Sequence, residues 1–82
     1  MFIVVRCIER DMNILGKYND FEDAVEKMEE DFEIVLKDYL DDEEFAEAQE
    51  NDFYGDDYQI HKNAGIAWAN LREDYDWQIF EI

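Results

Sequence analysis

The chain has 82 residues and a formal net charge of −17, which arises from 24 acidic and 7 basic side chains. A chain of this length forms one domain, residues 1–82, and its 48% hydrophobic content supplies a core despite a charge that favours disorder. The charge disfavours direct binding to nucleic acid or to anionic membrane, because both carry the same sign, and it favours basic proteins as partners.

Several residue types are missing or scarce, which narrows the chemistry. The chain has no Ser, Thr or Pro, so it lacks the hydroxyl nucleophiles of many hydrolases and the acceptors for Ser/Thr phosphorylation. Cys7 is the single cysteine and has no partner for an internal disulfide. The first residues lack the basic flank and long apolar run of a signal peptide, so we expect a cytoplasmic protein without a membrane-spanning segment.

Two strands are predicted at the start of the chain. Residues 2–9 carry apolar side chains on both faces, which is typical of a strand inside a sheet. A polar run over residues 9–12 then leads into a second strand over residues 13–18. We expect these strands to form a hairpin.

A long amphipathic helix is predicted over residues 20–40. Asn19 and Glu22 have the spacing of a capping box, which marks the first turn. Apolar side chains recur every three or four residues and fall in one sector of the helix: Phe21, Ala24, Val25, Met28, Phe32, Val35, Leu36 and Tyr39. At a rise of ~1.5 Å per residue the helix spans about 30 Å, enough to cross a small sheet.

A shorter helix is predicted from Asp41, which repeats the capping pattern with Glu44, to about residue 50. Phe45 and Ala48 are its only candidates for burial. Residues 51–57 then form a loop containing Gly55. Because this segment has so little to bury, we expect it to be the part of the chain that moves or becomes ordered on a partner.

Three further strands are predicted over residues 58–62, 66–71 and 75–82. The order is therefore ββααβββ, an α+β fold in which an antiparallel sheet of about five strands carries one long and one short helix on one face.

Large side chains occupy both faces of the predicted sheet. Residue parity groups Ile66, Trp68 and Trp77 on one face and Leu71 with Phe80 on the other. Scattered aromatic residues on the outer face are normal for a surface, but they also suit a dimer or partner interface.

Nearly all of the net charge lies in the central half of the chain. Residues 19–57 contain 18 acids and only two bases, Lys27 and Lys37, whereas the rest contains six acids and five bases. General adaptation to high salt would spread acid over the whole surface. Because like-charged neighbours on a helix cost a few tenths of a kcal/mol per pair, the concentration of acid indicates a basic partner.

The sequence predicts no catalytic residue, metal ion or cofactor. Cys7 lies in an apolar strand, so we expect a core residue rather than half of a dyad with His61, the only histidine. Calcium-loop registers through Gly16 and Gly55 lack the required oxygen ligands. Weak divalent-cation binding to residues 41–44 and a calcium-responsive protein stay open as lesser alternatives.

The predicted partner-binding site is the outward, acidic part of residues 20–57. Four of its glutamates form a row beside the apolar stripe, and Ile34 falls among the acids as a hydrophobic anchor. The candidate residues are Glu22, Asp23, Glu26, Glu29, Glu30, Glu33, Ile34, Asp41, Asp42, Glu43, Glu44, Glu47 and Glu50.

A rigid array of carboxylates imitates the phosphates of a nucleic acid and fits a groove lined by Lys and Arg. In size, acidity and mixed α/β make-up, the chain resembles the small DNA-mimic inhibitors of phages and mobile elements, such as anti-CRISPR and antirestriction proteins. This is a likeness of class that no particular run of residues carries. It implies a non-enzymatic inhibitor or adaptor that binds a basic, nucleic-acid-binding protein.

The alternative is a small structural or assembly module that forms a homodimer or a larger homo-oligomer through its aromatic sheet face. In that case the acid serves solubility, and Trp68 and Trp77 matter more than any glutamate.

Overall fold

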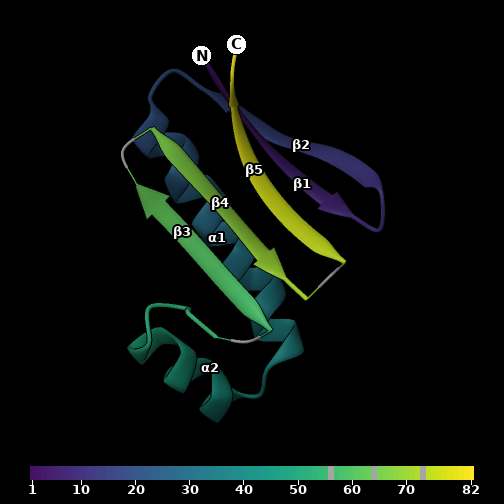
Figure 1. Cartoon of the computed structure of the whole chain (residues 1–82), viewed down its shortest axis with the longest axis vertical. Coiled ribbons are helices and arrows are strands. Elements are labelled where there is room, and N and C mark those ends of the chain that lie inside the picture. Colours follow the sequence, from purple (N-terminus) through teal and green to yellow (C-terminus); the bar gives the residue numbers. More distant parts are fainter. Residues whose placement is uncertain (56, 64, 73) are drawn as a thin grey trace.

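The computed structural model describes residues 1–55, 57–63, 65–72 and 74–82 (Figure 1). Its elements are β1 (Phe2–Ile8), β2 (Asp11–Tyr18), α1 (Phe21–Tyr39), α2 (Asp42–Glu50), β3 (Tyr58–Asn63), β4 (Ile66–Leu71) and β5 (Tyr75–Glu81). This order confirms the predicted ββααβββ fold. Asp56, Ala64 and Glu73, which fall in the predicted loop and in the turns between the last strands, lie outside the described residues.

The five strands form one antiparallel sheet in the order β2-β1-β5-β4-β3. The last strand pairs with the first, so the two ends of the chain lie side by side (Figure 1), and the Ile82 amide donates to the Met1 carbonyl at 2.8 Å. β1 therefore has a neighbour on each side, in agreement with its two apolar faces.

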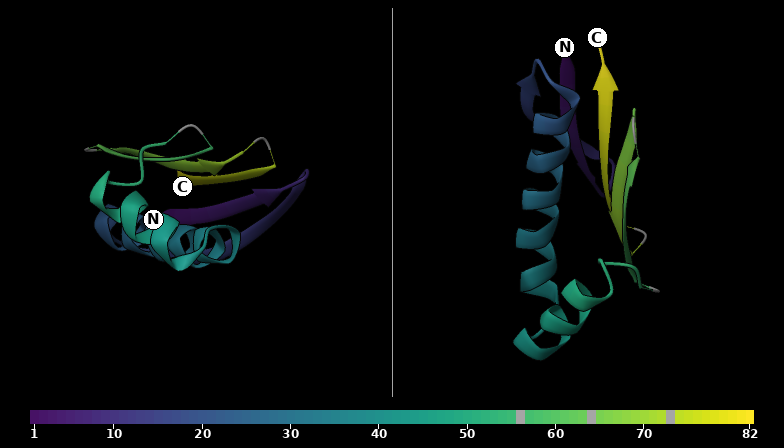
Figure 2. Two further views of the ribbon diagram at one scale, coloured as in Figure 1. Left: turned by 90° about the horizontal axis from the view of Figure 1, so that it is seen from below. Right: turned by 90° about the vertical axis from the view of Figure 1, so that its left-hand side faces the viewer.

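α1 covers one face of the sheet (Figure 2). Its predicted stripe supplies four fully buried side chains: Ala24, Met28, Phe32 and Leu36. They pack with Val4 of β1 and Trp77 of β5 in a single core cluster. Tyr39, at the end of the stripe, is instead 38% exposed, and the Arg72 guanidinium lies 4.6 Å from its ring centre. In the described part of the chain, no helix is long and apolar enough to cross a membrane.

The start of α1 differs by one residue from the prediction. Asp20, rather than Asn19, is the N-cap, and its carbonyl accepts from the Ala24 amide at 3.2 Å. No side chain caps this end, so the Asn19–Glu22 capping box is wrong. The spacing of polar residues in the sequence does not by itself decide whether Asn19 or the adjacent Asp20 is the N-cap.

α2 lies across the end of α1 (Figure 2), and its cap is as predicted: the Asp41 carboxylate accepts from the Glu44 amide at 2.8 Å. Phe45 and Ala48 are buried, as expected. The loop residue Phe53 is also buried, which the sequence analysis missed.

Phe53 joins α2 to the main core through aromatic contacts. Its ring centre lies 5.8 Å from that of Phe32 on α1 and 5.8 Å from that of Phe45 on α2. Phe53 has a positive φ of 55°, a backbone conformation that is uncommon for a bulky residue. Residues 42–53 are thus held by more burial than their polar sequence indicates.

The register between β4 and β5 corrects the predicted sheet faces. Trp77 pairs with Ala69, whereas Trp68 pairs with Gln78, so the two tryptophans lie on opposite faces. Trp77 is fully buried beneath α1, together with Leu71, and Trp68 lies on the face without helices. Parity holds along one strand, but register decides how one strand aligns with the next.

Candidate functional site

The helices divide their acids between the inside and the outside of the fold. Ten carboxylates are exposed, and we call this set the acidic surface: Glu22, Asp23, Glu26, Glu30 and Asp38 on α1, and Asp42, Glu43, Glu44, Glu47 and Glu50 on α2. All belong to the predicted site except Asp38, which lies in the last turn of α1 and was not singled out. The available signal was an acidic side chain in the last turn of the helix that does not belong to the predicted apolar stripe.

Asp31 lies on the same helix but faces inward. Its carboxylate is 2.9 Å from the Arg6 guanidinium and accepts from the Trp77 indole nitrogen at 2.7 Å. Both members of the ion pair are largely buried, with side chains 25% and 14% exposed. Asp31 therefore connects α1 to β1 and β5 and does not belong to the acidic surface.

Glu29 also has an internal partner. Its carboxylate binds the ammonium group of Lys62, on the edge strand β3, at 2.8 Å. The structure thus directs the row Glu22, Glu26, Glu29 and Glu33 toward the β3 side of the molecule, and Glu29 lies at the point where the row meets the sheet.

Glu33 is half-buried one helical turn after Glu29. Its partial burial and then the neighbouring Glu29 carboxylate raise its pKa above the ordinary 4.5, while Lys62 acts in the opposite direction. The ionised form of Glu33 is therefore held at a cost in the folded chain.

The acids of α2 fall into two groups. Asp42, Glu43 and Glu44 lie in the first turn, where the positive end of the helix dipole favours negative charge. Glu47 and Glu50 lie in the second half, where the dipole opposes them, and the last turn contains no basic residue. Among the described residues no Lys or Arg lies within 4 Å of any of these five carboxylates.

The outer side of α1 is not purely acidic. Lys27 lies 3.9 Å from Glu30, at the limit of an ion pair, and Lys37 lies over the Phe45 ring at 5.7 Å. Ile34 is 57% exposed among these charges, where the sequence placed it. The structure thus places an apolar side chain within the charged surface of α1.

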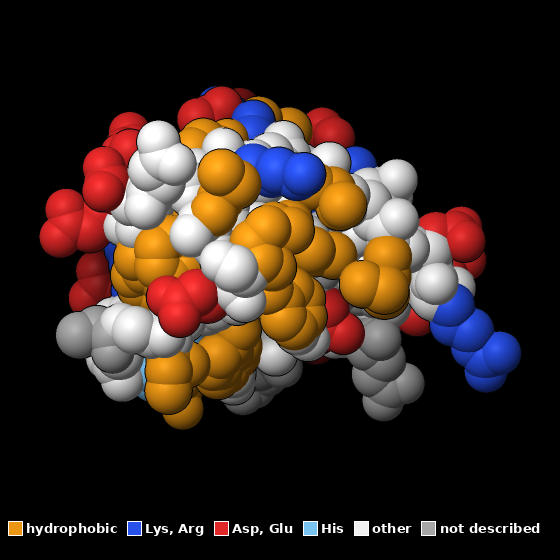
Figure 3. Space-filling model, turned by 90° about the horizontal axis from the view of Figure 1, so that it is seen from above, with side chains coloured by type: hydrophobic (Ala, Val, Ile, Leu, Met, Phe, Trp, Pro, Cys, Tyr) orange, Lys and Arg blue, Asp and Glu red, His pale blue; other side chains and the backbone are white. Residues whose placement is uncertain are grey.

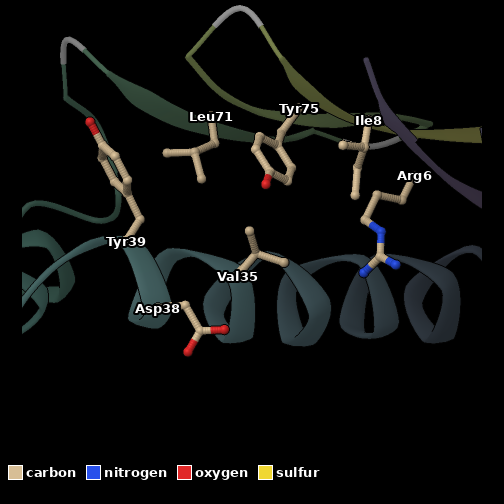
Figure 4. A pocket seen from close by; sticks show the side chains of 7 residues that line it. All are labelled: Arg6, Ile8, Val35, Asp38, Tyr39, Leu71 and Tyr75. Atoms are coloured by element: carbon tan, nitrogen blue, oxygen red, sulfur yellow. The ribbon is translucent and has the colours of Figure 1, made fainter. Parts of the chain in front are cut away.

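A cleft of about 350 Å³ lies between the end of α1 and the sheet (Figure 4). The Tyr75 hydroxyl points from the sheet toward Val35 of the helix, and the Arg6 guanidinium reaches down beside them. Its lining is mainly apolar, and Asp38, at its border, belongs to the acidic surface. Arg6, which pairs with Asp31, and Asp38, which belongs to the acidic surface, therefore line the same cleft.

Cys7 and His61 are too far apart to act together. Cys7 is on β1 and His61 is on β3, with β5 and β4 between them. Three strand spacings separate them by about 14 Å. His61 instead stacks on Trp68, with ring centres 5.3 Å apart, and shares a hydrogen bond with Asn63. Among the described residues no three His, Cys, Asp or Glu side chains are grouped to hold a metal ion.

No protein-family model, curated protein or solved structure matches this chain. The acidic surface and the outer face of the sheet are therefore interpreted from their own geometry and charge.

Proposed function

We propose that this chain is a non-enzymatic interaction protein that binds a basic, nucleic-acid-binding protein through the acidic surface, as a DNA-mimic inhibitor. The observation that carries the proposal is a group of exposed carboxylates without any internal role. Glu26, Asp38, Glu47 and Glu50 lie beyond the favourable first turns, and no described Lys or Arg is paired with them. Their cost to the folded chain is offset if a basic partner binds them.

The density of charge on α2 supports a nucleic-acid-like surface. The helix carries five carboxylates in nine residues. At a rise of ~1.5 Å per residue this is about one charge per 2.7 Å, which lies between the ~1.7 Å of duplex DNA and the ~3.4 Å of one of its strands. The Lys and Arg side chains of a DNA-binding groove thus meet a charge density close to that of their usual ligand.

The partner is sought by immobilising the chain in low salt and eluting bound proteins with a salt gradient or with duplex DNA. We expect basic nucleic-acid-binding proteins that elute at moderate salt and are displaced by DNA, because both ligands occupy one groove. Recovery of no basic protein, or of proteins that DNA does not displace, would contradict the proposal.

A triple variant then tests the acidic surface directly. Glu26→Gln, Glu47→Gln and Glu50→Gln together remove three charges that have no internal partner. We expect partner affinity to fall about tenfold or more while stability stays the same or rises, because the lost charges act only outward.

The matched control removes the same number of charges at the β-turns: Glu9→Gln, Asp11→Asn and Asp74→Asn. These exposed residues lie at the turn between β1 and β2 and before β5. Affinity should change little in the control, and an equal loss would mean that net charge alone, not the acidic surface, determines binding.

A further inference from the structure

The strand residues on the face of the sheet opposite α1 are apolar or neutral polar, apart from one residue of each charge. Its strand residues include the apolar or aromatic side chains Ile3, Val5, Cys7, Met12, Ile14, Ile66, Trp68 and Phe80. Its only charged strand residues are Lys17 and Asp76, one of each sign. A chain with a net charge of −17 thus keeps one neutral surface.

This outer face is also hollowed. A depression of about 250 Å³ lies between β2, β1 and β5, with Val5, Met12 and Phe80 among its lining residues. Met12 and Ile14 are 67% and 63% exposed, although they lie on a strand and not in a loop. Hydrophobic side chains also gather at the end of the molecule where the termini meet (Figure 3). Contiguous apolar surface of this kind is typical of an interface.

We infer that the outer face of the sheet is the two-fold interface of a homodimer. Charge identifies the occupant as a second copy of the chain. Two copies repel each other wherever their acidic surfaces meet, but the neutral face allows close approach. In a symmetric pairing each copy contributes one positive residue, Lys17, and one negative residue, Asp76, so the strand residues of the interface add no net charge.

The dimer separates the acidic layers. With about 10 Å for each packed layer, the α1 helices of two copies lie about 30 Å apart on opposite sides of the two sheets. This exceeds the Debye length of about 8 Å at physiological ionic strength, so their repulsion is largely screened. Each acidic surface stays free for a partner.

The size of the face fits a weak dimer. The four spacings of ~4.8 Å between the five strands, and strand lengths of six to eight residues at ~3.3 Å each, give roughly 400–500 Å² per copy. The two faces together approach the ~1,000 Å² minimum for a specific interface, so we expect dissociation in the micromolar range. Trp68 and Phe80 supply the large aromatic contacts typical of such interfaces.

Sedimentation equilibrium from about 1 μM to about 1 mM tests the dimer, which has twice the 9.9 kDa mass of the chain. Ile14→Glu should raise the dissociation constant about tenfold or more, because a carboxylate is buried without a partner. Ile34→Glu is the matched control: it makes the same change at a residue of similar exposure, 57%, on the helix side. It should leave the dimer unchanged.

Trp68 provides a second measurement on the unaltered chain. Its fluorescence should shift to the blue with rising concentration, whereas Trp77 is already buried, and Trp68→Phe should remove the shift. A monomer over the whole range would overturn the inference. So would a dimer that Ile34→Glu weakens as much as Ile14→Glu does.

Salt distinguishes this interface from the acidic surface. Added salt should tighten the dimer, because it screens repulsion between two negative chains, but it should weaken a basic partner. The opposite salt dependences allow the dimer and the proposed function to be tested separately.

Discussion

Asp31 lies on a strongly acidic helix, yet its carboxylate binds inward to Arg6 and Trp77. Asp31→Asn removes the charge that neutralises a largely buried guanidinium. We expect a loss of about 2–3 kcal/mol in the free energy of unfolding, measured by urea denaturation. Asp38→Asn, on the same helix but exposed and opposed by the dipole, should be neutral or stabilising by a few tenths of a kcal/mol. Equal effects of the two changes would contradict the inward role of Asp31.

Glu33 makes stability depend on pH. Because its folded pKa is raised, the folded chain binds the proton more tightly than the unfolded chain does. Ionised Glu33 therefore destabilises the fold above the raised pKa, and the penalty disappears as pH falls to the ordinary 4.5 and below.

Glu33→Gln should thus stabilise the chain at pH 7 by a few tenths of a kcal/mol, the usual cost of a like-charged pair one turn apart. The gain should vanish below about pH 4, where both forms are uncharged. Thermal unfolding at several pH values measures it, with the exposed Glu9→Gln, outside the helices, as control. A gain that persists at low pH would show that charge is not its cause.

At the scale of elements, the turn between β1 and β2 is strained. Glu9 and Arg10 both have positive φ, 48° and 85°, the conformation of the two-residue hairpin turn that favours Asn-Gly. Arg10→Gly removes the steric strain of the positive φ at this position, because glycine has no Cβ. It should stabilise the chain by about 0.5–1 kcal/mol in denaturant unfolding. Lys17→Gly, inside β2, should destabilise it by about the same amount. If Arg10→Gly did not stabilise the chain, the proposed strain at this turn would be contradicted.

Phe53 holds α2 on the rest of the molecule. Phe53→Ala removes the ring between Phe32 and Phe45 and should cost about 3 kcal/mol. Amide hydrogen exchange should rise first in Asp42–Glu50, because this helix has few other buried side chains. Tyr54→Ala changes the neighbouring residue, which is 72% exposed, and should have little effect. Unchanged exchange in α2 would show that other contacts anchor it.

The net charge of the whole molecule opposes its compact fold. A net charge of −17 on 82 residues repels itself in the compact state, and salt screens this repulsion. Raising NaCl from about 20 mM to about 0.5 M should raise Tm by several degrees, because ~1 kcal/mol corresponds to ~4–8 °C in a domain of this size. The triple Glu→Gln variant should show a smaller rise. A Tm independent of salt would contradict the repulsion.

The order of elements and the acidic content of the helices could be predicted from the sequence. Ala24, Met28, Phe32 and Leu36 repeat with the period of a helix, so the buried stripe of α1 is a local property of the chain. The Asp41 cap is equally local, since donor and acceptor lie three residues apart. Exposure of Glu22, Asp23, Glu26 and Glu30 followed from the same periodicity.

Tertiary structure alone decided which acids face inward, which face Trp68 occupies and where Phe53 lies. Asp31 meets Arg6 and Trp77 across 25 and 46 residues. The contact with Arg6 requires α1 to pack on β1, and the contact with Trp77 also requires β5 to lie beside β1. Trp68 faces away from α1 because of the register between β4 and β5. Periodicity describes one element at a time, whereas pairing and register depend on all of them, so the division between acidic and neutral surfaces is a property of the folded chain.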